Sequence, residues 1–281
     1  MMRSFARRRL LLPILWPAAV LQALWAQDAR LLPAVSRGSA EVPFRIEWRL
    51  GPDFPYYVKG GACGALDGEI VWAGGMQFPW REPTETVLLR ISALENPAHA
   101  VHAYCWLPEL PVKVGYTGGV SVGSALYVVG GRASGKRAFK LTKGPRRAAR
   151  PPSGYSEFEW RWEALPDTSE RHVYPAVVAV GDRVVVHGSG STTSGVAAGP
   201  AVAVEVLDTK FPERGWARLP ACPSAAAGKF AGSARGRLYL FGGYSPGTKQ
   251  SAPSVEGQFS GYFNNARTRT SYVYDFGAAA W

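Results

Sequence analysis

Length, composition and charge narrow the classes of protein to which this chain can belong. It has 281 residues, 47% of them hydrophobic, which is enough for a substantial core. The chain has 32 lysines and arginines and 21 acids, a net charge of +11. Four of the arginines, Arg3 and residues 7–9, precede the N-terminal apolar run; without them the count is 28 to 21, a net charge of +7. Because this excess is spread along the chain, it favours a small anionic ligand over a nucleic acid, which usually requires clustered charge.

Residues 1–26 have the composition of an export signal. A basic start precedes the apolar run LLLPILWPAAVLQALWA, which contains two prolines and is short for a transmembrane helix. We predict a signal peptide cleaved after Ala26, which would place the folded part in the periplasm or outside the cell and leave no membrane span in the mature chain. An uncleaved N-terminal anchor is the alternative.

Four strand–turn–strand units recur after this segment. Each contains a short apolar run that follows a tight turn and ends at a glycine, namely Gly74, Gly130, Gly188 and Gly242. The spacings between these glycines are 56, 58 and 54 residues. A period near 50 residues built from strands is the signature of a β-propeller.

A second mark keeps the same period. Trp48, Trp106, Trp162, Trp216 and Trp281 are separated by 58, 56, 54 and 65 residues, and the middle three lead into Leu-Pro phrases. Two marks in phase across residues 44–281 resemble the kelch repeat. The resemblance implies an all-β, kelch-type β-propeller of four-stranded antiparallel blades, in a family whose propellers usually have six or seven blades. A sandwich or barrel with accidental periodicity is the alternative.

The repeats divide the chain as follows. Residues 27–41 form a linker, residues 42–281 form the propeller, and about four blades are visible. The predicted blades span about 57–108, 115–166, 174–220 and 229–281, with 42–50 as an outer closing strand. In blade one, the predicted first strand 62–66 pairs with the second strand 69–73, and 125–129 is the second strand of blade two. The predicted third strands of the four blades are 86–91, 138–141, 202–207 and 271–274. Residues 143–156 are predicted to interrupt the strand pattern of blade two.

The position of Trp281 leaves two interpretations of blade four. A fourth strand should begin at this tryptophan, and no strand follows it in the sequence. Either further blades are missing from the sequence, which we favour, or residues 42–50 close a four-bladed ring. A chain with an unpaired blade edge is expected to self-associate.

The cysteines and histidines give no strong sign of a metal or cofactor. Cys63, Cys105 and Cys222 lack CxxC spacing and are interpreted as buried thiols, although one disulfide is possible in an exported protein. His99 and His102 have HxxH spacing, but no neighbouring acid or cysteine completes a site. We therefore expect neither a metal nor a cofactor.

Propellers usually bind ligands at one mouth of their channel, and two sets of segments would build that mouth here. One set follows the glycine-ended strands, and the other leads from one blade into the next. Arginine forks and tyrosine hydroxyls there would suit a carboxylated or polyhydroxylated ligand. The predicted ligand-binding residues are Arg81, Arg132, Arg171, His172, Tyr174, Ser189 and Tyr244. Further mouth candidates are Lys59, Gln77, Glu82, Lys113, Tyr116, Ser134, Lys136 and Lys229.

Residues 226–281 contain the run GKFAG at 228–232, a strand that ends at Gly242 and Gly243, a long loop rich in Asn and Gly, and then an aromatic strand and Trp281. In these features the segment is similar to one blade of the secreted bacterial sialic acid mutarotases. That family carries a glutamate right after the equivalent of Gly188 and an arginine in the same loop. Here Ser189 takes the glutamate's position, and no acid or arginine follows before Pro200. Since ring opening of a sugar hemiacetal needs a general acid or base, we assign no catalytic residue.

The sequence thus predicts an exported propeller that binds a small, anionic carbohydrate. Its partner would be a sugar or sugar acid, with no nucleic acid. A protein-interaction scaffold is the first alternative, and a sugar mutarotase or epimerase is the second. A wide apolar rim at the mouth would favour the scaffold, and an acid–base pair at the mouth would favour the enzyme.

Overall fold

The structure is a computed structural model, and it divides the chain into the units Met1–Leu50 and Gly51–Trp281. It describes residues 53–77, 81–91, 103–189, 203–223, 229–242, 244–245, 266–267 and 271–281, all in the second unit. The predicted signal peptide, linker and closing strand 42–50 lie outside these residues, as does the HxxH pair. No helix among the described residues is long and apolar enough to cross a membrane.

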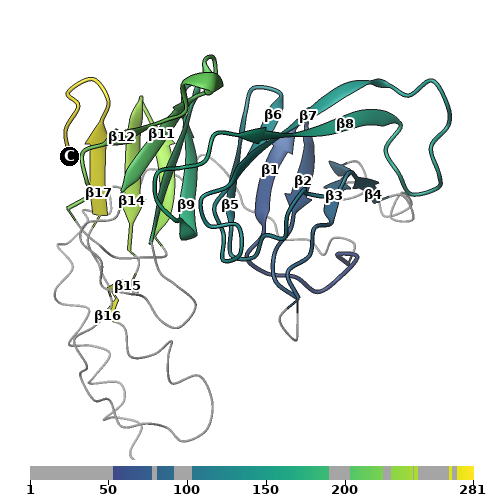
Figure 1. Cartoon of the computed structure of the whole chain (residues 1–281), viewed down its shortest axis with the longest axis horizontal. Helices are drawn as coiled ribbons and strands as arrows, with labels where there is room; N and C mark the ends of the chain where they lie inside the picture. Colours follow the sequence, from purple (N-terminus) through teal and green to yellow (C-terminus); the bar gives the residue numbers. More distant parts are fainter. Residues whose placement is uncertain are drawn as a thin grey trace, which may run out of the picture. The chain divides into compact units, whose positions relative to one another are not determined.

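The described residues form the four blades of an all-β propeller (Figure 1). Blades one to three are antiparallel sheets of four consecutive strands, and blade four has three described strands in the order β13-β14-β17. The strands of blades one and two are β1 (Ala62–Leu66), β2 (Glu69–Ala73), β3 (Thr86–Leu89), β4 (Tyr104–Leu107), β5 (Gly118–Val122), β6 (Ala125–Val129), β7 (Ala138–Arg146) and β8 (Phe158–Leu165).

The second half of the chain repeats this pattern. Its strands are β9 (Val173–Val180), β10 (Arg183–Ser189), β11 (Val204–Asp208), β12 (Trp216–Leu219), β13 (Phe230–Ala234), β14 (Arg237–Phe241) and β17 (Ser271–Asp275). A 3-10 turn, η3 (Pro212–Arg214), precedes β12, and β15 (Tyr244–Ser245) pairs with β16 (Ala266–Arg267) beside blade four.

Tight turns fix the register of the inner hairpins. Asp67 and Gly68 both have positive φ, at 51° and 80°, as do Arg235 and Gly236 in blade four, at 51° and 71°. Two-residue turns of this kind match the twist of the strands they join. The predicted pairing of 62–66 with 69–73 is confirmed residue by residue, from Ala62 with Ala73 to Leu66 with Glu69.

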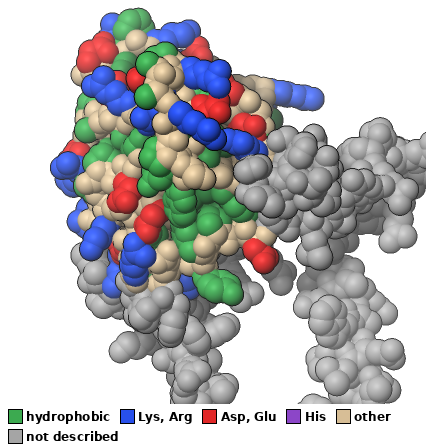
Figure 2. Space-filling model, turned by 90° about the vertical axis from the view of Figure 1, so that its right-hand side faces the viewer, with side chains coloured by type: hydrophobic (Ala, Val, Ile, Leu, Met, Phe, Trp, Pro, Cys, Tyr) green, Lys and Arg blue, Asp and Glu red, His purple; other side chains and the backbone are tan. Residues whose placement is uncertain are grey.

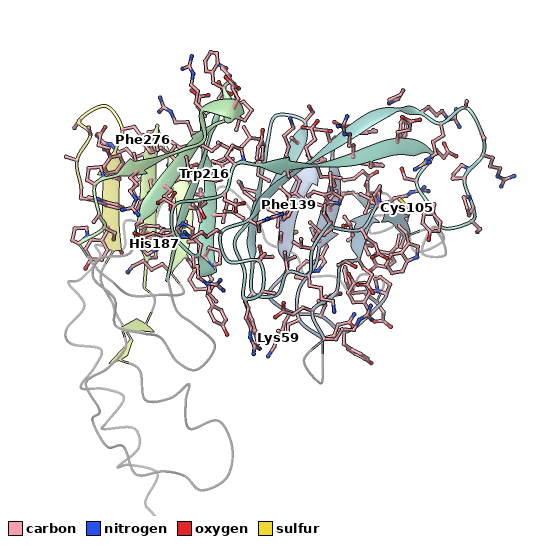
Figure 3. The ribbon with its side chains drawn as sticks, in the orientation of Figure 1. Lys59, Cys105, Phe139, His187, Trp216 and Phe276 are labelled. Atoms are coloured by element: carbon pink, nitrogen blue, oxygen red, sulfur yellow. The ribbon has the colours of Figure 1, made fainter. Side chains whose placement is uncertain are left out.

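The core lies between successive blades. The inner strands β1, β5, β9 and β13 are neighbours in that order. Three hydrophobic clusters fill the spaces between blades one and two, two and three, and three and four. Phe139, labelled in Figure 3, belongs to the first cluster and is 2% exposed. Each blade therefore buries its apolar faces against its neighbours in the chain.

The repeated tryptophans link successive blades at their outer edges. In three blades the indole Nε1 donates to a proline carbonyl in the Leu-Pro phrase of the preceding blade. The bonds run from Trp162 to Pro108 (2.9 Å), from Trp216 to Pro166 (2.9 Å) and from Trp281 to Pro220 (2.7 Å). Trp281 thus occupies the same position as the other repeat tryptophans, as its spacing predicts.

Two predictions need correction. Residues 143–156 do not break the sheet of blade two at Lys143, because β7 continues to Arg146, which pairs with Phe158 across a bulge. The Lys143 ammonium forms an ion pair with Asp67 (2.9 Å) and lies 4.1 Å from the centre of the Phe158 ring. Lys143 therefore has an acidic and an aromatic partner while its backbone stays in β7. The predicted burial of all three cysteines is wrong for Cys63, which is exposed, whereas Cys105 and Cys222 are buried; none of the three forms a disulfide.

Candidate functional site

Backbone hydrogen bonds bring the two predicted sets of mouth segments together. The N–H of Gly75, after β2, donates to the Val114 carbonyl on the segment leading into β5 (2.8 Å). The N–H of Gly131, after β6, donates to the His172 carbonyl just before β9 (2.7 Å). We call this edge of the sheets the mouth; Lys59 marks it at the lower side of Figure 3.

Arg132 and Arg171 meet at the mouth although 39 residues separate them. Arg171 Nη2 donates to the Arg132 carbonyl (3.1 Å). A Cβ on Gly135 would lie 2.9 Å from Arg171 Cζ, so the glycine leaves room for the guanidinium. Both arginines keep donors for a further acceptor, since a guanidinium has five N–H groups.

Arg81 is engaged within its own loop. Its Nη1 donates to the Gln77 amide oxygen (3.2 Å), and its Nη2 pairs with the Glu85 carboxylate. Burial raises the pKa of the neighbouring Glu82 carboxyl, and the positive charges of Arg132 and Lys113 oppose that rise. An anion at the mouth therefore competes with Glu82 for Arg132.

His172 is fully buried and hydrogen bonded to an acid that the sequence analysis did not single out. Its Nε2 lies 3.0 Å from Oε1 of Glu205 on β11, and neither side chain is exposed. Glu205 also accepts from the backbone N–H groups of Ser169 (2.8 Å) and Glu170 (3.2 Å). Burial raises the Glu205 pKa, but these hydrogen bonds outweigh it and hold the pKa below its ordinary value.

The role of this pair is to position other residues, because it has no access to solvent. Glu205 fastens residues 169–172 to β11, and that segment carries Arg171. Because an ionised carboxylate only accepts hydrogen bonds, the proton of the shared bond belongs to His172 Nε2. His172 therefore holds the backbone of the mouth segment in place, and its predicted role as a ligand-binding residue is wrong because its side chain is fully buried.

Two further buried polar side chains lie in blades three and four. His187 on β10 is 2% exposed, and neither ring nitrogen has a hydrogen-bond partner among the described residues. Burial, with the nearby charges of Lys229 and His172, lowers the His187 pKa to about 3. Burial also lowers the pKa of Lys229, whose Nζ donates to the Gly242 carbonyl (3.0 Å). His187 thus stays neutral at physiological pH.

The remaining predicted residues divide into described and undescribed side chains. Tyr174 is half-buried, with its ring centre 4.4 Å from that of Tyr116 on the preceding blade. Ser189 ends β10 and Tyr244 begins β15, but both side chains lie outside the described part. Among the residues that the structure describes, no three acids, histidines or cysteines gather as metal ligands.

Glu205 is the main residue that sequence reasoning missed. Its signal was an acid inside the apolar strand VEVL, since a charge there is almost never buried without a partner. The sequence could not name that partner, because 33 residues separate Glu205 from His172.

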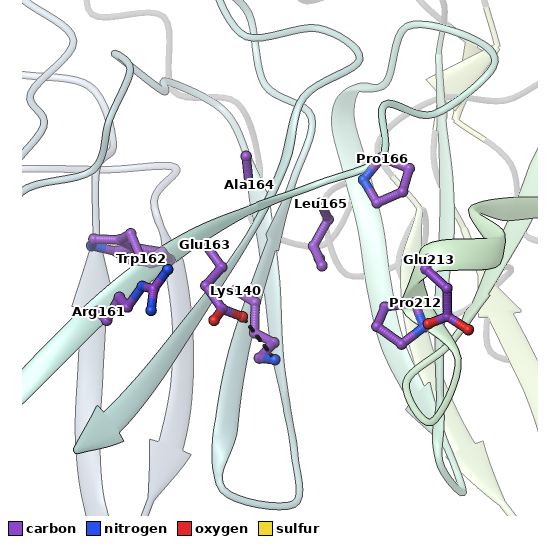
Figure 4. Close-up of a pocket in the computed structure, with 9 residues that line it drawn as sticks. All are labelled: Lys140, Arg161, Trp162, Glu163, Ala164, Leu165, Pro166, Pro212 and Glu213. Atoms are coloured by element: carbon purple, nitrogen blue, oxygen red, sulfur yellow. Dashed lines mark ion pairs between the residues drawn. The ribbon is translucent and has the colours of Figure 1, made fainter. Parts of the chain in front are cut away.

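Two hollows of the described surface lie away from the mouth residues. A groove of about 460 Å³ runs between β8 and η3, where the Lys140 ammonium pairs with Glu163 at 2.9 Å (Figure 4). A second hollow, of about 340 Å³, lies between blades one and two, where Arg90 and Trp160 form part of its lining. Neither hollow includes any of the seven predicted ligand-binding residues.

The fold defines the chain as a β-propeller, and the comparison with solved structures agrees. The structure of YjhT matches with a TM-score of 0.50 and 16% identity, covering 70% of this chain. The match spans 63% of the YjhT chain. At this identity the likeness shows the fold alone.

The comparisons by sequence find no match, whereas the comparison by structure finds many. No protein-family model matches the chain, and no curated protein matches it. In contrast, 148 chains of solved structures match. The backbone arrangement of blades is therefore shared more widely than the residues that build it, and the site must be argued from this chain's own side chains.

Proposed function

We propose that this chain is an exported β-propeller that binds a small anionic carbohydrate at its mouth. The observation that supports this most is that the Arg171 guanidinium donates to the backbone carbonyl of Arg132, which brings the two arginine-bearing segments together at the mouth. An arginine can hold a carboxylate through two parallel hydrogen bonds. Lys59 and Lys113 add positive charge on neighbouring segments of the mouth.

Calorimetric titration with acidic and neutral sugars tests this proposal. Hydrogen bonds to charged groups contribute about 1.5–3 kcal/mol each, so Arg132→Ala or Arg171→Ala should weaken binding of an acidic sugar roughly ten- to a hundredfold. Arg146→Ala is the matched control, because this exposed arginine pairs with Glu157 on the β7–β8 hairpin. Equal affinity for acidic and neutral sugars would contradict the proposal.

Mutarotation is not part of the proposed activity. Ser189 stands where the resembling family has its glutamate, and Glu205 is fully buried and accepts three hydrogen bonds. Neither group is placed to exchange a proton with a hemiacetal at the mouth. We expect NMR of a freshly dissolved α-anomer to show that the anomers equilibrate at the rate seen in solvent alone. Faster equilibration would support mutarotase activity.

Export is tested separately. N-terminal sequencing of the protein from its producing cell should begin near Gln27, as the basic start and short apolar run predict. A chain that begins at Met1 and is recovered from the cytoplasm would contradict this part of the proposal.

A protein-interaction scaffold is the second candidate, and one surface favours it. Figure 2 shows a band of hydrophobic side chains bordered by charged ones on the side where blade one lies. In blade one, Phe54 packs against Trp72 and Tyr104, and its ring centre lies 5.7 and 5.8 Å from theirs. Tyr57 is 95% exposed. Exposed apolar patches of this kind often mark partner sites.

Cys63 offers a direct probe of that surface. It pairs in register with Trp72, so both side chains share one face of blade one. A fluorophore on this exposed thiol should report a partner that covers the face, since Cys105 and Cys222 are buried. If a partner binds without changing the probe's emission, the face of blade one is not its docking site.

A further inference from the structure

One backbone position repeats at the mouth with an unusual conformation. Gly60 and Tyr116 lie two residues before β1 and β5, Tyr174 is the second residue of β9, and their φ angles are 63°, 53° and 53°. Glycine adopts this left-handed region without cost, whereas a bulky residue there is an outlier. Gly60 shows that the fold accepts glycine at this position, so the two tyrosines are not explained by backbone geometry.

The two tyrosine rings pack against each other at the mouth. The Tyr116 ring covers Gly60, where an added Cβ would lie 2.9 Å from Tyr116 Cδ1. The Tyr174 ring follows, with its centre 4.4 Å from that of Tyr116 and its plane tilted by 41°. The Tyr174 N–H donates to the Tyr116 carbonyl (3.1 Å), which fixes the two backbones side by side. Both residues are half-buried, so each keeps part of its surface exposed.

Positive groups surround this surface. Lys59 Nζ lies 5.9 Å from the centre of the Tyr116 ring. The Arg132 N–H donates to the carbonyl of Gly115, the residue before Tyr116 (2.6 Å). Arg171, three residues before Tyr174, reaches back to the Arg132 carbonyl. The Arg171 guanidinium and the backbone of Arg132 thus lie next to the segment that carries Tyr116.

We propose that Tyr116 and Tyr174 are a stacking platform for the apolar face of a pyranose ring, whose carboxylate Arg132 and Arg171 hold. The inference rests on the proposed function and narrows its ligand to a cyclic, carboxylated sugar. The C–H groups on one face of a pyranose are apolar, and they match the electron-rich face of an aromatic ring. An open-chain acid offers the carboxylate but no such face.

Three probes separate the platform from the arginine pair: glucuronic acid, its open-chain analogue gluconic acid, and neutral methyl glucoside. Tyr116→Gly should weaken binding of glucuronic acid at least tenfold and leave gluconic acid unchanged. The same variant should unfold at the same or a higher urea concentration, because glycine removes the strain of the left-handed residue. Tyr116→Phe keeps the ring face and should bind as the unchanged protein does.

Tyr57→Gly is the matched control, since this exposed tyrosine lies outside the platform. The platform is refuted if glucuronic acid binds Tyr116→Gly and Tyr174→Gly as well as it binds the unchanged protein. It is also refuted if Tyr116→Gly loses stability in proportion to affinity, since the ring is then structural. If both acids respond to Arg171→Ala but not to the tyrosine variants, the proposed function stands and the platform falls. If methyl glucoside binds as tightly as glucuronic acid and depends on Tyr116, the anionic claim falls and the platform stands.

Discussion

Acidification should destabilise this propeller through His187, a buried imidazole without hydrogen-bond partners among the described residues. Its pKa is about 3 in the folded protein and 6.5 in the unfolded chain. Between these values the unfolded chain binds more protons, so stability falls as pH falls through this window. From pH 7.5 to pH 5 the linkage relation gives a loss of about 2 kcal/mol in the free energy of unfolding from this one group.

Two substitutions separate titration from polarity. His187→Leu removes the proton site and both polar nitrogens, and it should flatten the pH dependence by about 2 kcal/mol while also stabilising the protein at pH 7.5. His187→Gln should flatten the dependence without that second gain, because its amide remains a buried polar group.

Urea unfolding followed by tryptophan fluorescence measures both effects. The series should stay above pH 5, since Glu205 loses its contribution only as pH falls below its ordinary value of 4.5 toward its lowered folded pKa. If both variants lose as much stability between pH 7.5 and pH 5 as the unchanged protein, His187 is not the titrating group and the argument fails.

Three other predictions follow from single contacts. Glu205→Ala should lower the free energy of unfolding by about 3–5 kcal/mol, because it leaves a buried imidazole and two N–H groups unsatisfied, and Glu205→Gln should cost less in the same urea series. Trp216→Phe should cost about 1–2 kcal/mol through the lost bond to the Pro166 carbonyl, and an unchanged urea midpoint would make that bond incidental. Glu82→Gln should tighten binding of acidic sugars at neutral pH, since it frees Arg132 from a competing carboxylate, and calorimetry showing weaker binding would argue against a cationic mouth.

The sequence predicted the parts of the fold that are local or periodic. The hairpin through Asp67 and Gly68 follows from two adjacent turn residues and an alternating pattern, so its register could be derived residue by residue. The equivalence of Trp281 with Trp216 follows from spacing. The extension of β7 beyond Lys143 could not be predicted, because it depends on the ion pair between Lys143 and Asp67, which lies in another blade 76 residues away.

The candidate site was predictable in location but not in pairing. The loops after the glycine-ended strands and the segments that lead into the next blade lie at the same edge, so Arg132 and Arg171 could be placed at one mouth from the repeat. Arg81 also follows a glycine-ended strand, yet its guanidinium bonds Glu85 four residues later, a choice that depends on loop conformation. The burial of His172 behind Glu205 was equally hidden, since the sequence does not show which strand receives the side chain.

The tryptophan–proline bonds give the array a directional character. Each indole reaches back to the blade before it, and each hydrophobic cluster joins only consecutive blades. Stability in such an array is close to a sum of single-unit and nearest-neighbour terms. Under force applied to one end, the blades should therefore detach one after another, with a separate rupture event for each. The loss of a single indole bond should weaken one such event and leave the others in place.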